Sequence, residues 1–380
     1  MTEQIATLLR EESRALHVPE PDTGAILRAG RRRRRGRSAA RGAGTLVVVG
    51  ILVAASLALR PGAKAGERVL TPQQRFDAAA PAVAYADYGA FSSGNVVYVG
   101  NNRVRFEDKI KALYYTSAGV LVRAGRSSAT DSRGPSRYTL IRPDGEISNV
   151  PLEMGDRIPG TDIDSPIVAY AAPTDDPKRW DLVATDVTTG KEVHRTTVTG
   201  SFTWGGWEAP PVSTHGERMW AHFDDGWLEY DWSSGETRKV PDTEQVSETE
   251  HGRYAAVGRT DWTVRDWESG AAISRLPMGK DDYGFLSPDG RFLRTFNQMD
   301  GMLDDGPPPA PKIFDIDNGT SHQLPRTADQ YGWTPDGKVL IVDARRDALT
   351  TCDVPSGACE TVEVAIENHA VKLGGNSYES

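Results

Sequence analysis

The sequence has few of the residues and motifs on which enzyme active sites usually depend. Only 2 cysteines and 7 histidines occur among 380 residues, and no histidines have helix-face or zinc-finger spacing. There is no Gly-x-Ser-x-Gly elbow, no Walker loop and no Gly-x-Gly-x-x-Gly after a strand. These absences argue against α/β-hydrolases, P-loop enzymes and dinucleotide-binding enzymes. We therefore predict no catalytic, cofactor-binding or metal-ligating residues.

Long apolar runs are also scarce, and one run stands out. Residues 42–59 carry no charge and are rich in Val, Leu, Ala and Ile. As a helix they would span about 27 Å, close to the ~30 Å hydrocarbon core of a bilayer. Seven arginines precede the run: Arg31 to Arg35, Arg37 and Arg41. Because arginine is retained on the cytoplasmic side, we predict a transmembrane helix over 42–60, with residues 1–41 inside and the body outside.

The cytoplasmic stub has a helical pattern of its own. Ile5, Leu8, Leu9 and Leu16 have helical spacing, which predicts a short helix before the prolines at 19 and 21. This helix could dock a cytosolic partner or only set the topology. The layout of short helix, arginine run and single span resembles the front of many single-pass envelope proteins of high-GC Gram-positive bacteria. A signal peptide cleaved after Ala65 is the alternative, and it also places the body outside the cytoplasm.

The charge distribution argues against a nucleic-acid partner. Residues 1–65 carry 12 Lys/Arg against 5 Asp/Glu, whereas residues 66–380 carry 32 against 48. A body with this excess of acidic residues would be repelled by phosphate backbones. The arginine run also lacks interleaved aromatic residues. We therefore expect the lipid bilayer, through residues 42–60, to be one partner, and we expect no nucleic acid.

Two kinds of turn recur along the body. The first is a tight turn ending in Gly between two apolar stretches, as in residues 283–296 (Ser-Pro-Asp-Gly) and 331–342 (Thr-Pro-Asp-Gly). A third copy lies at 88–99, and weaker copies lie at 113–119, 212–216 and 248–252. The second is an Asp-to-Gly turn, whose glycines or their equivalents recur about every 42 residues: Gly145, Gly190, Gly235, Gly270, Gly319 and Gly357. Two hairpins per unit at this period are typical of a four-stranded propeller blade.

The body therefore resembles WD40-like and TolB-like β-propellers, through its Ser-Pro-Asp-Gly and Thr-Pro-Asp-Gly turns. We predict an all-β fold of seven blades, with six as the alternative, over residues 76–373, and no helix after Leu59. The linker is 61–75 and the tail is 374–380. The predicted units are 84–106, 110–152, 163–199, 201–240, 246–276, 282–324 and 328–364. Because the first unit is too short for four strands, residues 369–373 should supply its missing strand and close the ring.

The remaining candidate residues concern a disulfide and a binding surface. Cys352 and Cys359 flank one turn, so outside the cytoplasm we expect them to form a disulfide. Loops between the second and third strands of a blade lie on one face, and three are long: 123–137, 172–179 and 297–312. Seven of nine tryptophans fall between 204 and 267. Most should pack between blades, and the candidate binding surface consists of Trp204, Trp207, Asp304 and Asp305.

We interpret the chain as a membrane-anchored, extracytoplasmic propeller that binds a protein or glycan without catalysis. Two other functions remain open. Residues 184–194 resemble the docking motif of quinoprotein propellers with His194 in place of Trp, which implies a quinone-dependent dehydrogenase. The adjacent cysteines of many such enzymes are missing. A propeller hydrolase belongs to the same enzyme alternative, and a transmembrane sensor reporting through residues 2–29 is the other.

Overall fold

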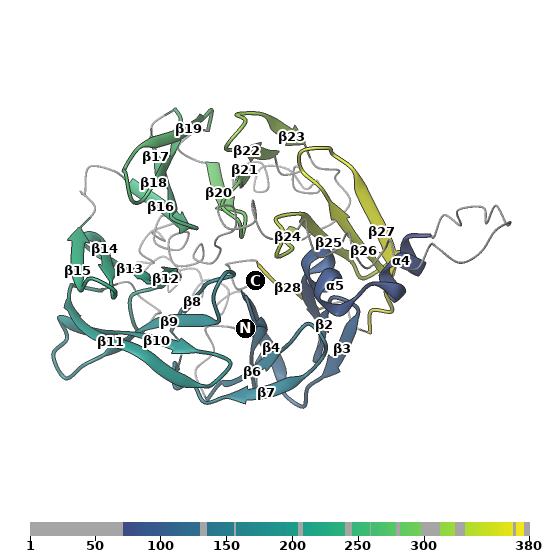
Figure 1. Ribbon diagram of the computed structural model, residues 1–380, viewed down its shortest axis with the longest axis horizontal. Coiled ribbons are helices and arrows are strands. Elements are labelled where there is room, and N and C mark those ends of the chain that lie inside the picture. Colours follow the sequence, from purple (N-terminus) through teal and green to yellow (C-terminus); the bar gives the residue numbers. More distant parts are fainter. Residues whose placement is uncertain are drawn as a thin grey trace, which may run out of the picture.

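Seven four-stranded antiparallel sheets are arranged in a ring (Figure 1). The computed structural model describes residues 71–129, 135–155, 157–203, 208–239, 245–258, 260–278, 282–297, 312–323, 331–367 and 370–375. The predicted transmembrane segment 42–60 and the short cytoplasmic helix lie outside these residues. Within the described part of the chain, no helix is long and apolar enough to cross a membrane.

Each blade has its first strand nearest the centre of the ring and its fourth strand at the rim (Figure 1). Blade 1 contains β28 (Val371–Leu373), β1 (Ala90–Ser93), β2 (Val96–Val99) and β3 (Asn102–Arg105). Blade 2 contains β4 (Lys109–Thr116), β5 (Gly119–Gly125), β6 (Arg137–Ile141) and β7 (Ile147–Val150). Blade 3 contains β8 (Gly160–Thr161), β9 (Ile167–Pro173), β10 (Arg179–Asp186) and β11 (Lys191–Thr199).

The other four blades are each continuous in sequence. Blade 4 contains β12 (Val212–His215), β13 (Arg218–Phe223), β14 (Gly226–Asp231) and β15 (Glu236–Lys239). Blade 5 contains β16 (Gln245–Glu250), β17 (Arg253–Val257), β18 (Trp262–Asp266) and β19 (Ala272–Leu276). Blade 6 contains β20 (Asp282–Leu286), β21 (Phe292–Asn297), β22 (Lys312–Asp315) and β23 (Ser321–Gln323). Blade 7 contains β24 (Tyr331–Trp333), β25 (Val339–Asp343), β26 (Ala348–Cys352) and β27 (Cys359–Glu363).

The ring closes through its C-terminal strand, as predicted. β28 pairs with β1 in the register Phe91↔Leu373 and Ser93↔Val371. The backbone N–H of Gly374 donates to the carbonyl of Ala90 at 2.8 Å and extends this pairing. The first blade therefore combines one strand from the end of the chain with three from the start. The prediction of seven blades is confirmed, and the six-bladed alternative is wrong.

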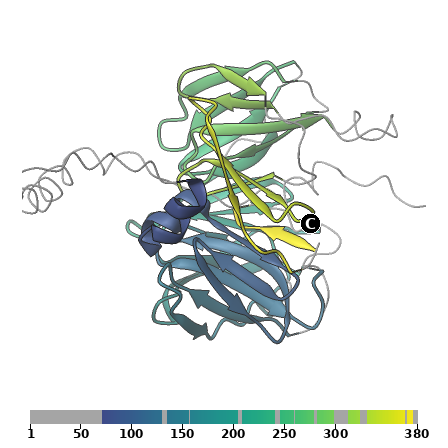
Figure 2. The same ribbon diagram turned by 90° about the vertical axis from the view of Figure 1, so that its right-hand side faces the viewer.

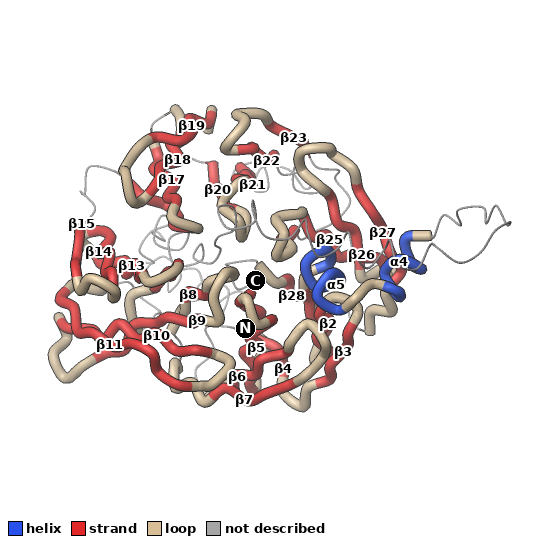
Figure 3. Tube along the Cα trace, viewed as in Figure 1, coloured by secondary structure: helices blue, strands red, loops and turns tan. Residues whose placement is uncertain are grey.

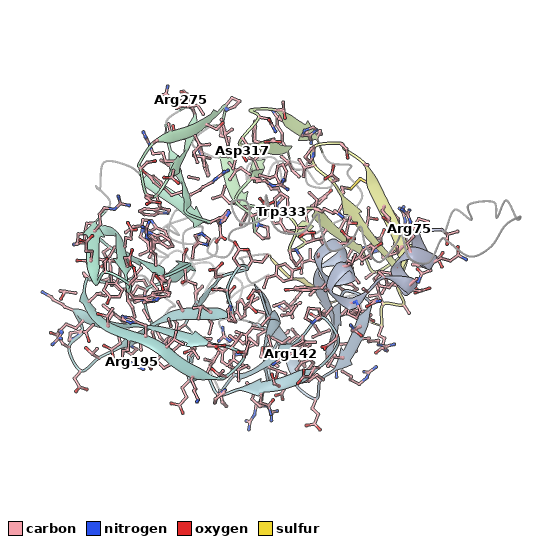
Figure 4. The ribbon with its side chains drawn as sticks, in the orientation of Figure 1. Arg75, Arg142, Arg195, Arg275, Asp317 and Trp333 are labelled. Carbon is pink, nitrogen blue, oxygen red and sulfur yellow. A yellow bond between two sulfur atoms is a disulfide. The ribbon has the colours of Figure 1, made fainter. Side chains whose placement is uncertain are left out.

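The hydrophobic core is divided among the blade interfaces. Within the described residues there are seven clusters of buried side chains, and each joins two neighbouring blades. The period-2 alternation of strands explains this division. In β13, Met219 and Ala221 pack in the cluster shared with blade 3, whereas Trp220 packs in the cluster shared with blade 5. Among the labelled residues of Figure 4, Trp333 lies toward the middle of the ring and Arg195 at its rim.

Within the described residues, two short helices precede the first strand, and the prediction of no helix after Leu59 is wrong. They are α4 (Pro72–Ala78) and α5 (Pro81–Tyr88), which are blue in Figure 3. Thr71 caps α4 in a complete capping box with Gln74. The rings of Phe76 and Tyr88 pack edge-to-face, with centroids 4.9 Å apart, in the core cluster between blades 7 and 1. In edge-on view, the helices lie at one margin of the ring (Figure 2).

The recurrent Asp-to-Gly turns join the third and fourth strands of their blades. In each of five turns the glycine N–H donates to the carbonyl of the aspartate: Gly190 to Asp186, Gly235 to Asp231, Gly270 to Asp266, Gly319 to Asp315 and Gly357 to Asp353. The aspartate side chain also accepts bonds from inside the turn. Asp231, for example, accepts from the N–H and hydroxyl of Ser233, and these bonds, with Arg218, hold the pKa of Asp231 at about 2. The motif is thus a self-contained turn whose function is structural.

The predicted disulfide is present between Cys352 and Cys359. The two residues face each other across β26 and β27 of blade 7. Because Cys352 is buried among the side chains between blades 6 and 7, the bond links the core to the outer edge of the blade. No free cysteine remains, so neither sulfur is available as a nucleophile or metal ligand.

Candidate functional site

Polar side chains gather where three successive inner turns meet. In each blade the turn from the first to the second strand lies on one face of the ring, since neighbouring strands are antiparallel. The turns of blades 3, 4 and 5 follow β8, β12 and β16 (Figure 1). They contribute residues 162–166, His215 with Gly216, and His251 with Gly252. We call the group formed by Asp162, Asp164, His215 and His251 the inner-turn cluster.

Asp162 is the buried anchor of the inner-turn cluster. Its side chain is only 1% exposed. One carboxylate oxygen accepts from the N–H of Asp164, and the other accepts from the Ser165 hydroxyl and from the N–H of Gly216, each at 2.9 Å. The three donors satisfy this buried carboxylate as a hydrogen-bond acceptor. The bond to Gly216 also ties the turn of blade 3 to that of blade 4.

The two histidines of the cluster face each other. The Nδ1 atom of His215 lies 3.5 Å from the Oδ1 atom of Asp162. The rings of His215 and His251 meet edge-to-face with centroids 4.7 Å apart. Both imidazoles are partly buried, whereas Asp164 is exposed. The cluster is therefore open to solvent at one end and anchored in the protein at the other.

His251 has an unusual backbone conformation. Its φ angle is +54°, and Asp347 is the other non-glycine residue with positive φ in the part of the chain that the structure describes. Such positions carry strain and are frequent at functional sites. Gly290 of blade 6 makes room for His251, because a Cβ atom on Gly290 would lie 2.9 Å from the Cβ of His251. The imidazole of His251 therefore sits on a strained turn that packs closely against Gly290.

Arg253 connects the cluster to blade 6. Its guanidinium donates to the carbonyl of Gly290 at 2.9 Å and pairs with Asp317 at 2.9 Å. The positive charge next to the cluster is therefore already engaged by a carboxylate. Asp315 is also engaged, since its carboxylate accepts from Asp317 and Asn318 within their turn.

Three donor atoms of the cluster could hold a cation. One ligand atom each from Asp164, His215 and His251 lie within 4.8 Å of one another. Two imidazoles and one carboxylate form a donor set that suits divalent transition metals. No such site was predicted from the sequence, because no single histidine has a metal-ligand motif around it. The missed signal is that His-Gly occupies the same turn in two successive repeats, where later repeats have Asp-Gly.

The contact between Gly290 and His251 can be tested by a matched pair of substitutions. Gly290 and Gly319 have nearly the same φ, +65° and +66°, but a Cβ on Gly319 would meet nothing within 4 Å. We expect Gly319→Ala to lower the free energy of unfolding by about 1–2 kcal/mol, the cost of a left-handed alanine. Gly290→Ala should cost a further ~1–3 kcal/mol, because the methyl group overpacks against His251. Urea unfolding of both variants measures the difference, and equal losses would contradict the contact.

The predicted binding-surface residues Trp204, Trp207, Asp304 and Asp305 lie outside the described residues, so this surface stays a prediction. The packing role predicted for most tryptophans is confirmed for Trp220, Trp227, Trp262 and Trp267, which are buried in blade interfaces. His194, the residue in the quinoprotein-like motif, packs on Tyr230 and Trp232.

Comparison with known proteins supports no assignment beyond the fold. No protein-family model matches the chain, and no curated protein matches it. Among solved structures, apo AztD from Citrobacter koseri is 13% identical, with a TM-score of 0.45 over 75% of this chain and 96% of that one. TolB from Acinetobacter baumannii is 14% identical, with a TM-score of 0.39 over 75% of this chain and 66% of that one. At these values the likeness carries no argument about ligand or activity, and the propeller assignment rests on the chain's own sheet topology.

Proposed function

We propose that this chain is a cell-envelope protein whose propeller lies outside the cytoplasm, is anchored by residues 42–60 and binds a ligand without transforming it. The observation that carries the binding role is the inner-turn cluster. Side chains from three blades converge there on one face of a closed ring, around a buried carboxylate. Ligand sites commonly combine such a rigid scaffold with a few convergent polar groups.

The chemistry of the cluster supports binding over nucleophilic catalysis. Ser165 lies in the same turn as Asp162 and Asp164, and its hydroxyl donates to Asp162 at 2.9 Å. A serine nucleophile needs a hydrogen bond to a general base, usually an imidazole, and here the serine bonds the carboxylate instead. Both cysteines are in a disulfide. A nucleophilic role for a serine or cysteine is therefore not what this geometry favours.

The location is supported by the charge pattern and by the disulfide. Seven arginines precede the apolar run 42–59, and the positive-inside rule then orients the propeller outward. Disulfides persist in oxidising compartments and are rare in the cytosol. The acidic body, with 48 Asp/Glu against 32 Lys/Arg after residue 65, disfavours nucleic acid as the ligand.

Protease treatment of intact cells tests this proposal. The full-length chain carries one epitope tag at each end and is expressed in a high-GC Gram-positive host whose outer wall layers have been removed. We expect added protease to remove the C-terminal tag while the N-terminal tag stays protected in the membrane fraction. Protection of both tags until the cells are lysed, or recovery of the chain from the cytosol, would refute the location. Recovery of the C-terminal domain alone from the medium would show cleavage after Ala65.

A further inference from the structure

We propose that Asp164, His215 and His251 bind a divalent transition-metal ion, with Zn²⁺ as the favoured ion. This inference names a ligand for the inner-turn cluster and rests on the proposed function for its biological setting. The metal site itself is argued only from the described side chains. Each ligand comes from the inner turn of a different blade, so the ion would join blades 3, 4 and 5.

The donor set and its spacing fit this ion. Zinc–nitrogen bonds of about 2.0–2.1 Å place tetrahedral donors roughly 3.4 Å apart. The three donor atoms already lie within 4.8 Å of one another, so small side-chain rotations bring them into range. Imidazole ligands favour transition metals over Ca²⁺ and Mg²⁺, which prefer oxygen donors. Zinc suits an oxidising compartment because it has no redox chemistry.

Asp162 is placed to act as the outer-shell partner that metal-bound histidines usually have. Its Oδ1 atom lies 3.5 Å from Nδ1 of His215 without a hydrogen bond between them, and its other contacts fix it in place. We expect the imidazole to turn into this hydrogen bond when the ion binds, so that Nε2 faces the metal. Asp162 is therefore a positioning residue that acts through His215.

The backbone conformation of His251 also positions its imidazole for metal binding. A histidine with φ of +54° needs a surrounding structure that maintains it. Gly290 supplies that close contact, and Arg253 locks Gly290 through its carbonyl. The edge-to-face contact with His215, at 4.7 Å, keeps the two rings within reach of one ion.

The site leaves one coordination position open. Three protein ligands are the number found in zinc sites that keep a fourth position for water or an external group. Asp164 is exposed, so that position faces solvent. We infer that the ion is exchangeable and that the open position takes a water molecule or a donor atom from a ligand outside this chain.

Calorimetric titration of the full-length chain with ZnCl₂ tests the inference. The protein is purified in detergent without a polyhistidine tag and stripped of metal with a chelator. We expect one Zn²⁺ per chain, and no competition from a hundredfold excess of Ca²⁺. His215→Ala and His251→Ala should each weaken the zinc affinity at least ~100-fold, and Asp162→Asn should weaken it about 10–100-fold. At 100 times the dissociation constant, zinc should raise the melting temperature by roughly 5 °C.

Two further variants make the test decisive. His322→Ala removes a partly buried histidine from β23, the outer strand of blade 6, and should bind zinc like the wild type. Asp164→Asn changes an exposed side chain, so it keeps the fold and should still weaken the affinity. An absence of saturable zinc binding in the wild type, or wild-type affinity in the two histidine variants, would overturn the site. Either result leaves the envelope location untouched, because protease accessibility measures that location independently.

Discussion

Deletion of residues 369–380 should remove most of the stability of the propeller. The deletion takes away β28, the inner strand of blade 1, and leaves β1 as an open edge. Leu373 is 5% exposed and packs in the cluster between blades 7 and 1. Losing its burial costs about 2–3 kcal/mol, and the unpaired backbone groups of β1 add about 1–3 kcal/mol each. We expect a loss of roughly 5 kcal/mol or more, a large part of the stability of a typical domain.

The matched control for this deletion is a shorter truncation. Removing residues 376–380 leaves β28 and its pairing with β1 intact, and should leave the free energy of unfolding unchanged. Guanidinium unfolding compares the two chains. Size-exclusion chromatography should show self-association of the longer truncation alone, because an open strand edge pairs with other chains. A monomeric longer truncation with unchanged stability would show that closure by β28 contributes little.

The turns explain why the propeller could be predicted from the sequence. An Asp-to-Gly turn is built from bonds within five residues, such as Gly190 to Asp186, so its signature is complete in the local sequence. Gly235 and Gly357 have φ of +76° and +67°, a conformation that favours glycine. Because blades 3 to 7 repeat the turn, its period indicates the length of one blade even where individual copies are weak. The closing strand followed from counting strands in the first unit.

The features that were missed fall into two classes. The helix α4 has a complete local signal in Thr71, Pro72 and Gln74, a capping box that the expectation of an all-β body overrode. The inner-turn cluster has no complete local signal. Asp162 and Gly216 are 54 residues apart and meet only because blades 3 and 4 are neighbours in the ring. A repeat period predicts which turns share a face, but it does not predict which side chains come within bonding distance.

Trp267→Ala should be among the most destabilising single substitutions in the ring. Trp267 is 2% exposed and lies between blades 4 and 5, where its ring centroid is 5.5 Å from that of Trp220 and 4.7 Å from that of Tyr254. Removing the indole opens a cavity between aromatic side chains that come from both blades. We expect the free energy of unfolding to fall by about 3–5 kcal/mol, the usual cost of Trp→Ala in a core.

Trp232 is the matched control because it occupies the same position one repeat earlier. Each tryptophan follows the aspartate of its turn, and each backbone N–H donates to the preceding hairpin, Trp232 to Glu217 and Trp267 to Gly252. Trp232 is only partly buried and stacks on His194, so Trp232→Ala should cost about 1 kcal/mol. Guanidinium unfolding measures the loss of unfolding free energy in each variant. The difference between the two losses separates the contribution of burying the indole ring from that of its position in the turn. Similar losses would mean that the shared position in the turn, and not the interface between blades 4 and 5, determines the stability contributed by Trp267.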